Sequence, residues 1–209
     1  MYTPKYYQES DWEVIAGFIR ENGFGLLVNT DESNTPHATH IPLLLKEKAP
    51  GAFVLEGHIA RINPQWQYFS RGKSLAVFSG AHSYISSSWY EKSKIPTWNY
   101  MAVHIHGHTR IQSEEEVIAA LGELMKKYEA ASACPVHINE IDEKTLMNNV
   151  KAIVGFEMAV EEVTATYKLS QNKKANDYNS VIKHLQELGT ENTLKVAAEM
   201  EARRSDFQA

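Results

Sequence analysis

The residues best suited to bind a phosphate group lie between positions 57 and 66. This segment reads Gly-His-Ile-Ala-Arg-Ile-Asn-Pro-Gln-Trp and places His58 and Arg61 just before Asn63-Pro64. Asparagine is a favoured N-cap and proline a favoured first helical residue, so a helix is predicted to begin there. Free N–H groups at a helix start, beside a guanidinium and an imidazole, can hold a phosphate. An ordinary capped helix with a surface arginine is the alternative interpretation.

A second group of residues could bind a planar ring. The segments Ser83–Tyr90 and Pro96–Tyr100 are rich in tyrosine and tryptophan, and the first contains three consecutive serines, Ser86–Ser88. Three hydroxyl residues in a row predict a loop rather than a core strand. Such a loop offers hydrogen bonds and stacking surfaces together, which suits a heterocycle. An aromatic contact between two copies of the chain is the competing interpretation.

A long strand is predicted from Trp98 to Gln112, and its two faces differ. Because strand side chains alternate between faces, the odd and even positions separate. Four of the odd positions are large and apolar and belong in a barrel core: Met101, Val103, Ile105 and Ile111. The even positions, Ala102 apart, are aromatic or polar: Trp98, Tyr100, His104, His106 and His108. Three alternating histidines could bind zinc or iron, but no second ligand cluster accompanies them, so histidines at an interface are preferred.

Catalytic signatures are missing from the sequence. Ser86–Ser88 lacks the G-x-S-x-G turn of a serine hydrolase, and Cys134 precedes Pro135 without a nucleophile motif. Neither a GxGxxG fingerprint nor a P-loop occurs. We therefore expect no hydrolase chemistry, and any nucleotide phosphate must be held in another way.

Short apolar runs separated by turn residues predict a mainly β, antiparallel α+β barrel. The predicted strands are 25–30, 37–45, 52–57, 75–79, 98–112 and 153–168. Five helices are predicted. Two of them begin at capping boxes, at Ser10–Glu13 and Ser113–Glu116, and the other three span 142–150, 176–188 and 193–204. The helices are therefore inserted late in the barrel or appended to its end.

Composition narrows the possible functions further. The chain has 209 residues, a net charge of −5 and a single cysteine, with a pI of about 6.0. A single cysteine cannot form an internal disulfide, and no apolar stretch approaches a membrane span or a signal peptide, so a soluble, cytoplasmic protein is expected. An acidic chain is a poor candidate for a dedicated nucleic-acid binder, because DNA affinity comes mostly from Lys and Arg.

Several motifs together resemble the PaiB-type FMN-binding negative transcriptional regulators, a family of the pyridoxamine-phosphate-oxidase-like split-barrel flavoproteins. The matching pieces, in chain order, are MYTPKYY, ATHIPLLL, GHIARINPQW, VFSGAHSYISSSWY, IPTWNYMAVHIHG, AIVGFEM and KLSQNKKANDYNSV. Two differences from the family pattern occur near the aromatic loop. Ser87 replaces a proline, and the loop from Tyr90 to Ile95 is shorter than usual.

The resemblance implies a split-barrel FMN-binding domain over 1–168, with a helical appendage over 169–209. It implies a homodimer with FMN at the subunit interface. The 5′-phosphate would meet the loop around Arg61, and the isoalloxazine would lie near residues 39–42 and 98–100. The complete set of implied cofactor contacts is Thr39, His40, Ile41, Pro42, His58, Ala60, Arg61, Asn63, Trp66, Ser83, Tyr84, Trp89, Trp98, Asn99 and Tyr100.

The resemblance implies an FMN-binding regulator that represses protease and sporulation genes. The main alternative, an FMN-dependent oxidoreductase (a flavin reductase or small-molecule oxidase), needs the same cleft. A haem-binding split barrel is less favoured, because haem requires an axial histidine in an apolar pocket. No helix-turn-helix with a basic recognition helix is found. The best candidates for contact with DNA are Lys168, Lys173, Lys174 and Lys183. Acidic neighbours in the sequence predict weak direct binding, or binding that requires a partner protein.

Overall fold

The computed structural model describes residues 1–204, which form two compact units. The barrel unit consists of residues 19–78 and 105–163. The second, which we call the ribbon unit, consists of residues 1–18, 79–104 and the described chain from Thr164 onward. Within the described residues, no helix combines the length and the apolar character needed to cross a membrane.

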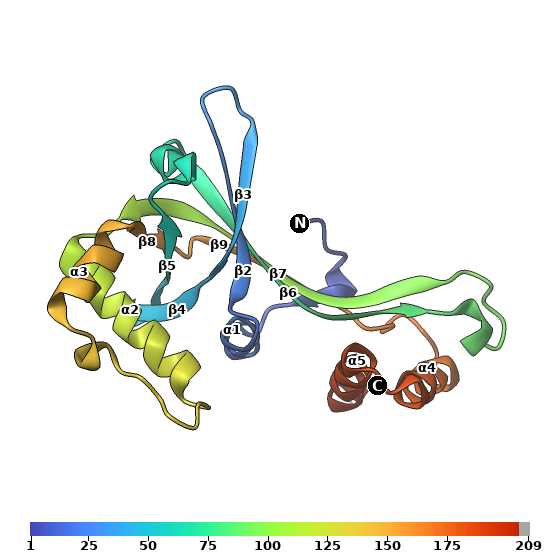
Figure 1. The fold of residues 1–209 in the computed structure, drawn as a ribbon. Helices are drawn as coiled ribbons and strands as arrows, with labels where there is room; N and C mark the ends of the chain where they lie inside the picture. Colours follow the sequence, from blue (N-terminus) through green and yellow to red (C-terminus); the bar gives the residue numbers. More distant parts are fainter. Residues whose placement is uncertain (205–209) are drawn as a thin grey trace. The chain divides into compact units, whose positions relative to one another are not determined.

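Nine strands and five α-helices make up these units (Figure 1). The strands are β1 (Gln8–Glu9), β2 (Phe24–Thr30), β3 (Pro36–Pro42), β4 (Leu44–Ala49), β5 (Ala52–Ala60), β6 (Lys73–Ile85), β7 (Thr97–Ile111), β8 (Ile153–Ala159) and β9 (Glu162–Lys168). The α-helices are α1 (Trp12–Glu21), α2 (Glu114–Glu129), α3 (Glu143–Lys151), α4 (Ala175–Leu188) and α5 (Glu191–Ala202). Short 3-10 helices η1 (Lys5–Tyr7), η2 (Pro64–Tyr68), η3 (Ser87–Trp89) and η4 (Ile138–Glu140) join some of them.

The barrel unit is a single antiparallel sheet with the strand order β3-β2-β6-β7-β8-β5-β4. Its two end strands, β3 and β4, are separated in the chain by Leu43 alone, so the sheet curls round on itself. Every register recorded within the unit is antiparallel, with Leu27 opposite Thr39 and His58 opposite Gly155. The predicted antiparallel α+β barrel is confirmed.

The barrel core is closed by large apolar side chains from opposite strands. Leu27, Leu55 and Phe78 have no exposed surface, and the rings of Phe69 and Phe156 meet edge to face with centroids 5.0 Å apart. Helices α2 and α3 pack against β8, and α2 also contacts β5. Burial of this apolar surface is the main force that holds the barrel unit together.

The ribbon unit contains the outer parts of β6 and β7, the β1–β9 pair and the packed helices α4 and α5. Gly189 ends α4 with φ of 65°, a left-handed conformation that glycine adopts without strain. Leu185 of α4 and Val196 of α5 are fully buried. The predicted appendage 169–209 corresponds to α4 and α5 in its described part, and residues 205–209 lie outside the described residues.

Two predicted strands are interrupted in the structure. The strand predicted at 37–45 is broken at Leu43, whose N–H donates to Gly23 O at 2.7 Å instead of to a neighbouring strand. The strand predicted at 153–168 is broken after Ala159, where Glu161 N donates to His106 O at 3.1 Å. Each break lets the chain change direction at a corner of the sheet.

Strand β6 is longer than the predicted 75–79, so Ser83 and Tyr84 lie in a strand rather than in the predicted loop. Ile111, predicted to lie in the core, is 50% exposed because it ends β7. The helix predicted after Asn63-Pro64 is the five-residue 3-10 helix η2.

Helix caps follow the sequence signals with one exception. The capping box at Ser113 and Glu116 is confirmed. The cap predicted at Ser10 is wrong, because Asp11 Oδ1 accepts from Glu13 N at 2.9 Å and Asp11 O accepts the first helical bond. An aspartate accepts such N–H groups at least as well as a serine, and its charge favours the helix N-terminus.

Candidate functional site

The segment after β5 forms a tight loop that leads into η2. Arg61 N donates to Ala152 O at 2.8 Å, and Asn63 N donates to Ala60 O at 2.9 Å. Asn63 caps η2, with its Oδ1 accepting from Gln65 N at 3.0 Å. The predicted N-cap role of Asn63 is therefore confirmed. Ala60, at the end of β5, is exposed beside this loop.

A chain of hydrogen bonds joins this loop to β2 and β3. Asn63 Nδ2 donates to Thr39 Oγ1 at 3.0 Å, and Thr39 Oγ1 donates to Gln65 Oε1 at 2.5 Å. Gln65 is 1% exposed, and its Nε2 donates to Leu27 O at 3.1 Å. The structure thus brings together Thr39 and Asn63, two predicted contacts, and joins both to a glutamine that sequence reasoning missed. The available signal was its place in the Asn-Pro-Gln-Trp motif.

The guanidinium of Arg61 is bonded within the chain through two of its nitrogens and, in the described structure, is free at the third. Its Nε donates to Lys151 O and its Nη2 to Ile153 O, both at 2.7 Å. These bonds fix the guanidinium against the start of β8. Its Nη1 amino group has no hydrogen-bond partner within residues 1–204, which leaves it available to an anion.

Trp66 also forms a hydrogen bond to this loop. Its Nε1 donates to Arg61 O at 3.0 Å, so the indole is anchored to the backbone of the arginine. Trp66, Arg61 and Ile153 line a groove of about 330 Å³. That volume lies at the lower end of the range for small-molecule sites.

His58 lies under α2, where it lines a cavity of about 10 Å³ together with Gln112, Val117 and Gly155. Burial lowers the pKa of His58, so its imidazole is neutral at pH 7 and adds no positive charge. The carboxamide of Gln112 is buried without a hydrogen-bond partner in the described structure. A cavity of this size holds about one water molecule, which could bond to both groups.

The remaining predicted residues of β3 differ in their exposure. His40 is exposed and stacks on Phe24 with ring centroids 6.1 Å apart. Ile41 is buried, and Pro42 ends the strand half-buried. His40 is therefore accessible to a ligand, whereas Ile41 belongs to the core.

In the ribbon unit, Tyr84 and Trp98 form an exposed aromatic pair. Their ring centroids lie 5.9 Å apart in an edge-to-face arrangement, and the residues are 48% and 52% exposed. His82 lies against the same indole at 6.1 Å. Ser83 points to the opposite face, where it is buried and donates to Tyr84 O. The exposed pair can still contact a ligand or a second chain.

Three further predicted contacts in the ribbon unit are buried or half-buried: Trp89, Asn99 and Tyr100. Trp89 stacks on His184 with centroids 5.1 Å apart and an interplanar angle of 11°. Asn99 has no exposed surface, and its Oδ1 accepts from Ser170 Oγ at 3.0 Å. Tyr100 is half-buried. We therefore expect Asn99 to position neighbouring residues rather than to contact a cofactor itself.

The alternating histidines do not form a metal centre in the described structure. Within residues 1–204, no group of three or more His, Cys, Asp or Glu side chains is arranged to hold a metal ion. His108 Nδ1 lies 2.8 Å from Glu161 Oε1, and this contact lowers the pKa of Glu161 to about 2. His108 thus has a carboxylate partner on its own chain.

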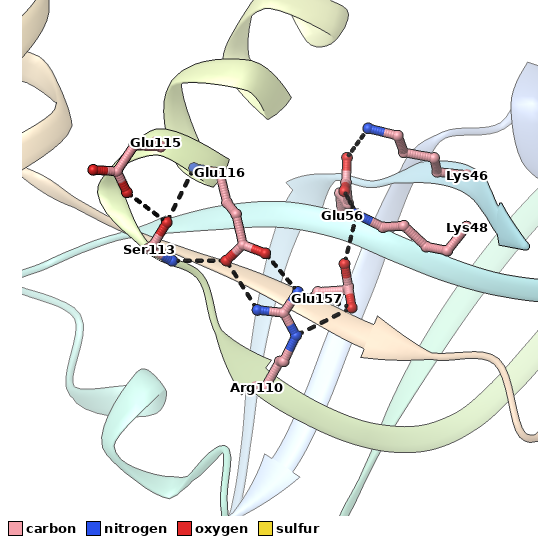
Figure 2. A network of polar contacts seen from close by, with 8 residues as sticks. All are labelled: Lys46, Lys48, Glu56, Arg110, Ser113, Glu115, Glu116 and Glu157. Carbon is pink, nitrogen blue, oxygen red and sulfur yellow. Dashed lines mark hydrogen bonds and ion pairs between the residues drawn. The ribbon is translucent and has the colours of Figure 1, made fainter.

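A network of charges holds α2 over the face of the barrel that contains His58 (Figure 2). Glu56 and Glu157 lie opposite each other on β5 and β8, and Lys48 bridges them at 2.6 and 2.8 Å. Arg110 contacts Glu157 at 3.2 Å and binds both oxygens of Glu116 at 2.8 and 2.9 Å. The lysine and the arginine offset the repulsion between the facing carboxylates and tie the first turn of α2 to the sheet.

Acid should weaken this attachment of α2. Arg110 is the main cause that lowers the pKa of Glu116 to about 2, below that of a carboxyl group in an unfolded chain. The stability it contributes is therefore complete above about pH 4.5 and is lost as the pH falls toward 2. We expect Glu116→Gln to reduce the loss of thermal stability between pH 5 and pH 2.5. Thermal unfolding at several pH values measures this.

The control is the same substitution in an Arg110→Met background. There Glu116 has lost its guanidinium partner, so Glu116→Gln should change the pH dependence much less. An equal effect of Glu116→Gln with and without Arg110 would show that another group shifts the titration.

Comparison with known proteins identifies the family. Residues 1–162 match the family described as "Putative FMN-binding domain". The Bacillus subtilis (strain 168) protein named "Protease synthase and sporulation protein PAI 2" is 41% identical over 202 residues, 96% of this chain and 97% of that protein. An uncharacterized protein of Saccharomyces cerevisiae, YKL070W, is 36% identical over 85 residues, 38% of this chain and 50% of that protein.

Solved structures with the same fold share little sequence with the chain. A FAD- and haem-binding protein from Mycobacterium smegmatis has a TM-score of 0.61 at 11% identity, over 83% of this chain and 79% of that chain. The flavocytochrome Anf3 from Azotobacter vinelandii has a TM-score of 0.58 at 14% identity, over 85% and 78%. With the match over residues 1–162, these likenesses establish that the chain is a split-barrel protein of the FMN-binding domain family, whose defining cofactor is FMN.

Proposed function

We propose that the protein is an FMN-binding regulator that represses transcription of protease and sporulation genes. The observation that carries this proposal is the 41% identity to PAI 2 of Bacillus subtilis, which extends over 96% of the chain. That relative is named for protease synthesis and sporulation. The single cysteine, Cys134, which is free and exposed, supports placement in the reducing cytoplasm.

The residues of the loop after β5 suit the phosphate of FMN. The segment 57–66 contains no carboxylate, and it offers the free Nη1 of Arg61 and one N–H of Asn63. Charge-assisted bonds from such donors to phosphate are stronger than neutral ones. When bound, FMN would supply hydride and electron chemistry of its own. We propose that the exposed His40 and the half-buried Pro42 of β3 also contribute to cofactor binding.

Spectroscopy and kinetics distinguish the regulator from its rivals. A regulator should take up FMN, with flavin bands near 370 and 450 nm, and should not accelerate NADH oxidation beyond free FMN. Deleting its gene should raise transcripts of protease and sporulation genes. Rapid turnover of NADH, with unchanged transcripts, would favour the oxidoreductase. A dominant Soret band from the purified protein would favour a haem carrier.

We expect the protein to be a homodimer with FMN at the interface. The exposed Tyr84–Trp98 pair presents an aromatic surface that is costly to leave in water. Sedimentation at micromolar concentration with FMN should give twice the chain mass of 23.6 kDa. Trp98→Ser should weaken the dimer, whereas Tyr128→Ser, at a tyrosine that is also 50% exposed, should not. A 23.6 kDa species in the wild type would contradict the prediction.

Direct binding to DNA should be weak, because the candidate lysines are partly engaged within the chain. Lys168 Nζ donates to Thr97 Oγ1 at 2.5 Å, Lys173 lies 4.2 Å from the ring centroid of Tyr90, and Lys183 lies near Glu187. Fluorescence titration against promoter DNA at physiological salt should show at most micromolar affinity. If specific nanomolar binding occurs without a partner, each contacting lysine removed should lower the salt slope by about 0.9.

A further inference from the structure

Gln65 is buried at the point where η2 meets β2 and β3, and its side chain makes three long-range hydrogen bonds. Its side chain bonds to Leu27, His37 and Thr39, and its backbone O accepts from Asn29 Nδ2 at 3.3 Å. A glutamine that is 1% exposed and fully bonded is held in one orientation.

The orientation of its amide follows from its neighbours. Two backbone carbonyls, Leu27 O and His37 O, lie 3.1 and 3.3 Å from one end of the amide. Carbonyl oxygens can only accept, so that end must be the NH₂ group of Gln65. The other end is therefore the carbonyl oxygen, Oε1, and it faces the hydroxyl of Thr39.

This orientation dictates the direction of the next two bonds. Oε1 of Gln65 can only accept, so Thr39 must donate its single hydroxyl proton to it. The Thr39 oxygen is then left as an acceptor, and it is filled by Asn63 Nδ2 at 3.0 Å. Asn63 Oδ1 in turn accepts from the backbone N of Gln65 at 3.0 Å. The circuit begins and ends on Gln65.

After these bonds, Asn63 has one polar hydrogen without an acceptor within residues 1–204, the second N–H of Nδ2. Its carbonyl oxygen is already occupied by Gln65 N. The half-buried end of the circuit thus offers a free donor, which suits an anion such as a phosphate oxygen.

We propose that Gln65 is a positioning residue which, through Thr39, holds Asn63 with an N–H directed to the phosphate of FMN. The proposal rests on the proposed function only in taking FMN as the ligand of this loop. Its consequence is specific: disturbing the circuit should weaken FMN more than riboflavin, because riboflavin lacks the phosphate.

The test is Thr39→Val, with Thr39→Ser as the matched control. Valine has the shape of threonine but cannot receive the Asn63 N–H or donate to Gln65, whereas serine can do both. Fluorescence titration of the purified protein should show FMN binding about tenfold to hundredfold weaker in Thr39→Val, the range of one bond to a charged group. Riboflavin affinity should change little, and Thr39→Ser should retain the wild-type ratio of the two affinities.

A second variant tests Gln65 itself. Gln65→Glu keeps the size of the side chain but replaces its NH₂ by an oxygen, which faces the two carbonyls. It should reduce the preference for FMN over riboflavin at pH 7. The preference should partly return at low pH, where a protonated glutamate can again donate. Thermal unfolding of each variant with no ligand present establishes that the protein remains folded at the pH used.

A double-mutant cycle separates this role from a structural one. In an Asn63→Ala background, Thr39→Val should have no further effect on the ratio of FMN to riboflavin affinity. If Thr39→Val weakens both ligands equally, or neither, the proposed role of Gln65 is wrong. If the wild type binds riboflavin as tightly as FMN, no phosphate is recognised here, and the proposed cofactor contact of the loop is wrong as well.

Discussion

Gly107→Ala should prevent the barrel unit from reaching its native packing. A Cβ atom added at Gly107 would lie 1.6 Å from the backbone O of Ala159 and 2.8 Å from its C atom. A flexible side chain could move aside, but here the obstacle is the backbone at the end of β8, close to the bond from Glu161 N to His106 O. We expect a loss of about 3 kcal/mol or more in the free energy of unfolding.

Thermal unfolding followed by circular dichroism measures this loss. For a chain of this length, 3 kcal/mol corresponds to a fall of roughly 6 °C or more in Tm. The control is Gly17→Ala in α1, where a Cβ meets no atom within 4 Å and alanine favours the helix by about 1 kcal/mol. An unchanged Tm for Gly107→Ala would mean that β7 and β8 can separate at this corner at little cost.

The elements predicted correctly are those that depend on local signals. The box of Ser113 and Glu116, the N-cap at Asn63 and the stop at Gly189 each involve atoms a few residues apart. Alternation along β7 likewise predicted that Val103 and Ile105 are buried. Such patterns follow from backbone geometry, so they can be recognised without a fold.

The strand breaks could not be predicted, because they depend on distant backbone atoms. Leu43 leaves the sheet to bond with Gly23 O, and Val160 does so to bond with Phe53 O at 3.0 Å. When the hydrogen-bond acceptors of an apolar run are unknown, the whole run is predicted as one strand. Gly107 indicates only that another backbone approaches β7 closely, which is where β8 ends at Ala159; it does not locate the break itself.

In the candidate site, too, some residues could be predicted from local sequence and others depend on distant parts of the chain. The segment around Arg61 and Asn63 could be predicted from residue types, whereas Gln65 could not, because its side chain bonds to carbonyls 38 and 28 residues away, on Leu27 and His37. The family resemblance also implied Asn99 as a cofactor contact. Its amide instead bonds to Ser170, which is 71 residues distant in the chain.

Arg61→Ala should weaken FMN binding by a factor of about 10 to 100 and leave riboflavin binding nearly unchanged. The free Nη1 group can donate to phosphate, and one bond to a charged group contributes roughly 1.5–3 kcal/mol. The other nitrogens bond to Lys151 O and Ile153 O, so a small loss of stability is also expected, about 1 kcal/mol. Titration of flavin fluorescence with both ligands, beside thermal unfolding, measures the two effects separately.

Two further substitutions make the result decisive. Arg61→Lys keeps the charge but cannot reach both carbonyls and a phosphate at once, so its FMN affinity should fall between those of alanine and the wild type. Arg71→Ala removes an exposed arginine of the same unit that pairs with Glu32 at 3.3 Å, and it should leave both flavins unaffected. If Arg61→Ala weakens riboflavin as much as FMN, the arginine acts only through Lys151 and Ile153. The phosphate would then be held by Asn63 and the backbone of the loop without a guanidinium.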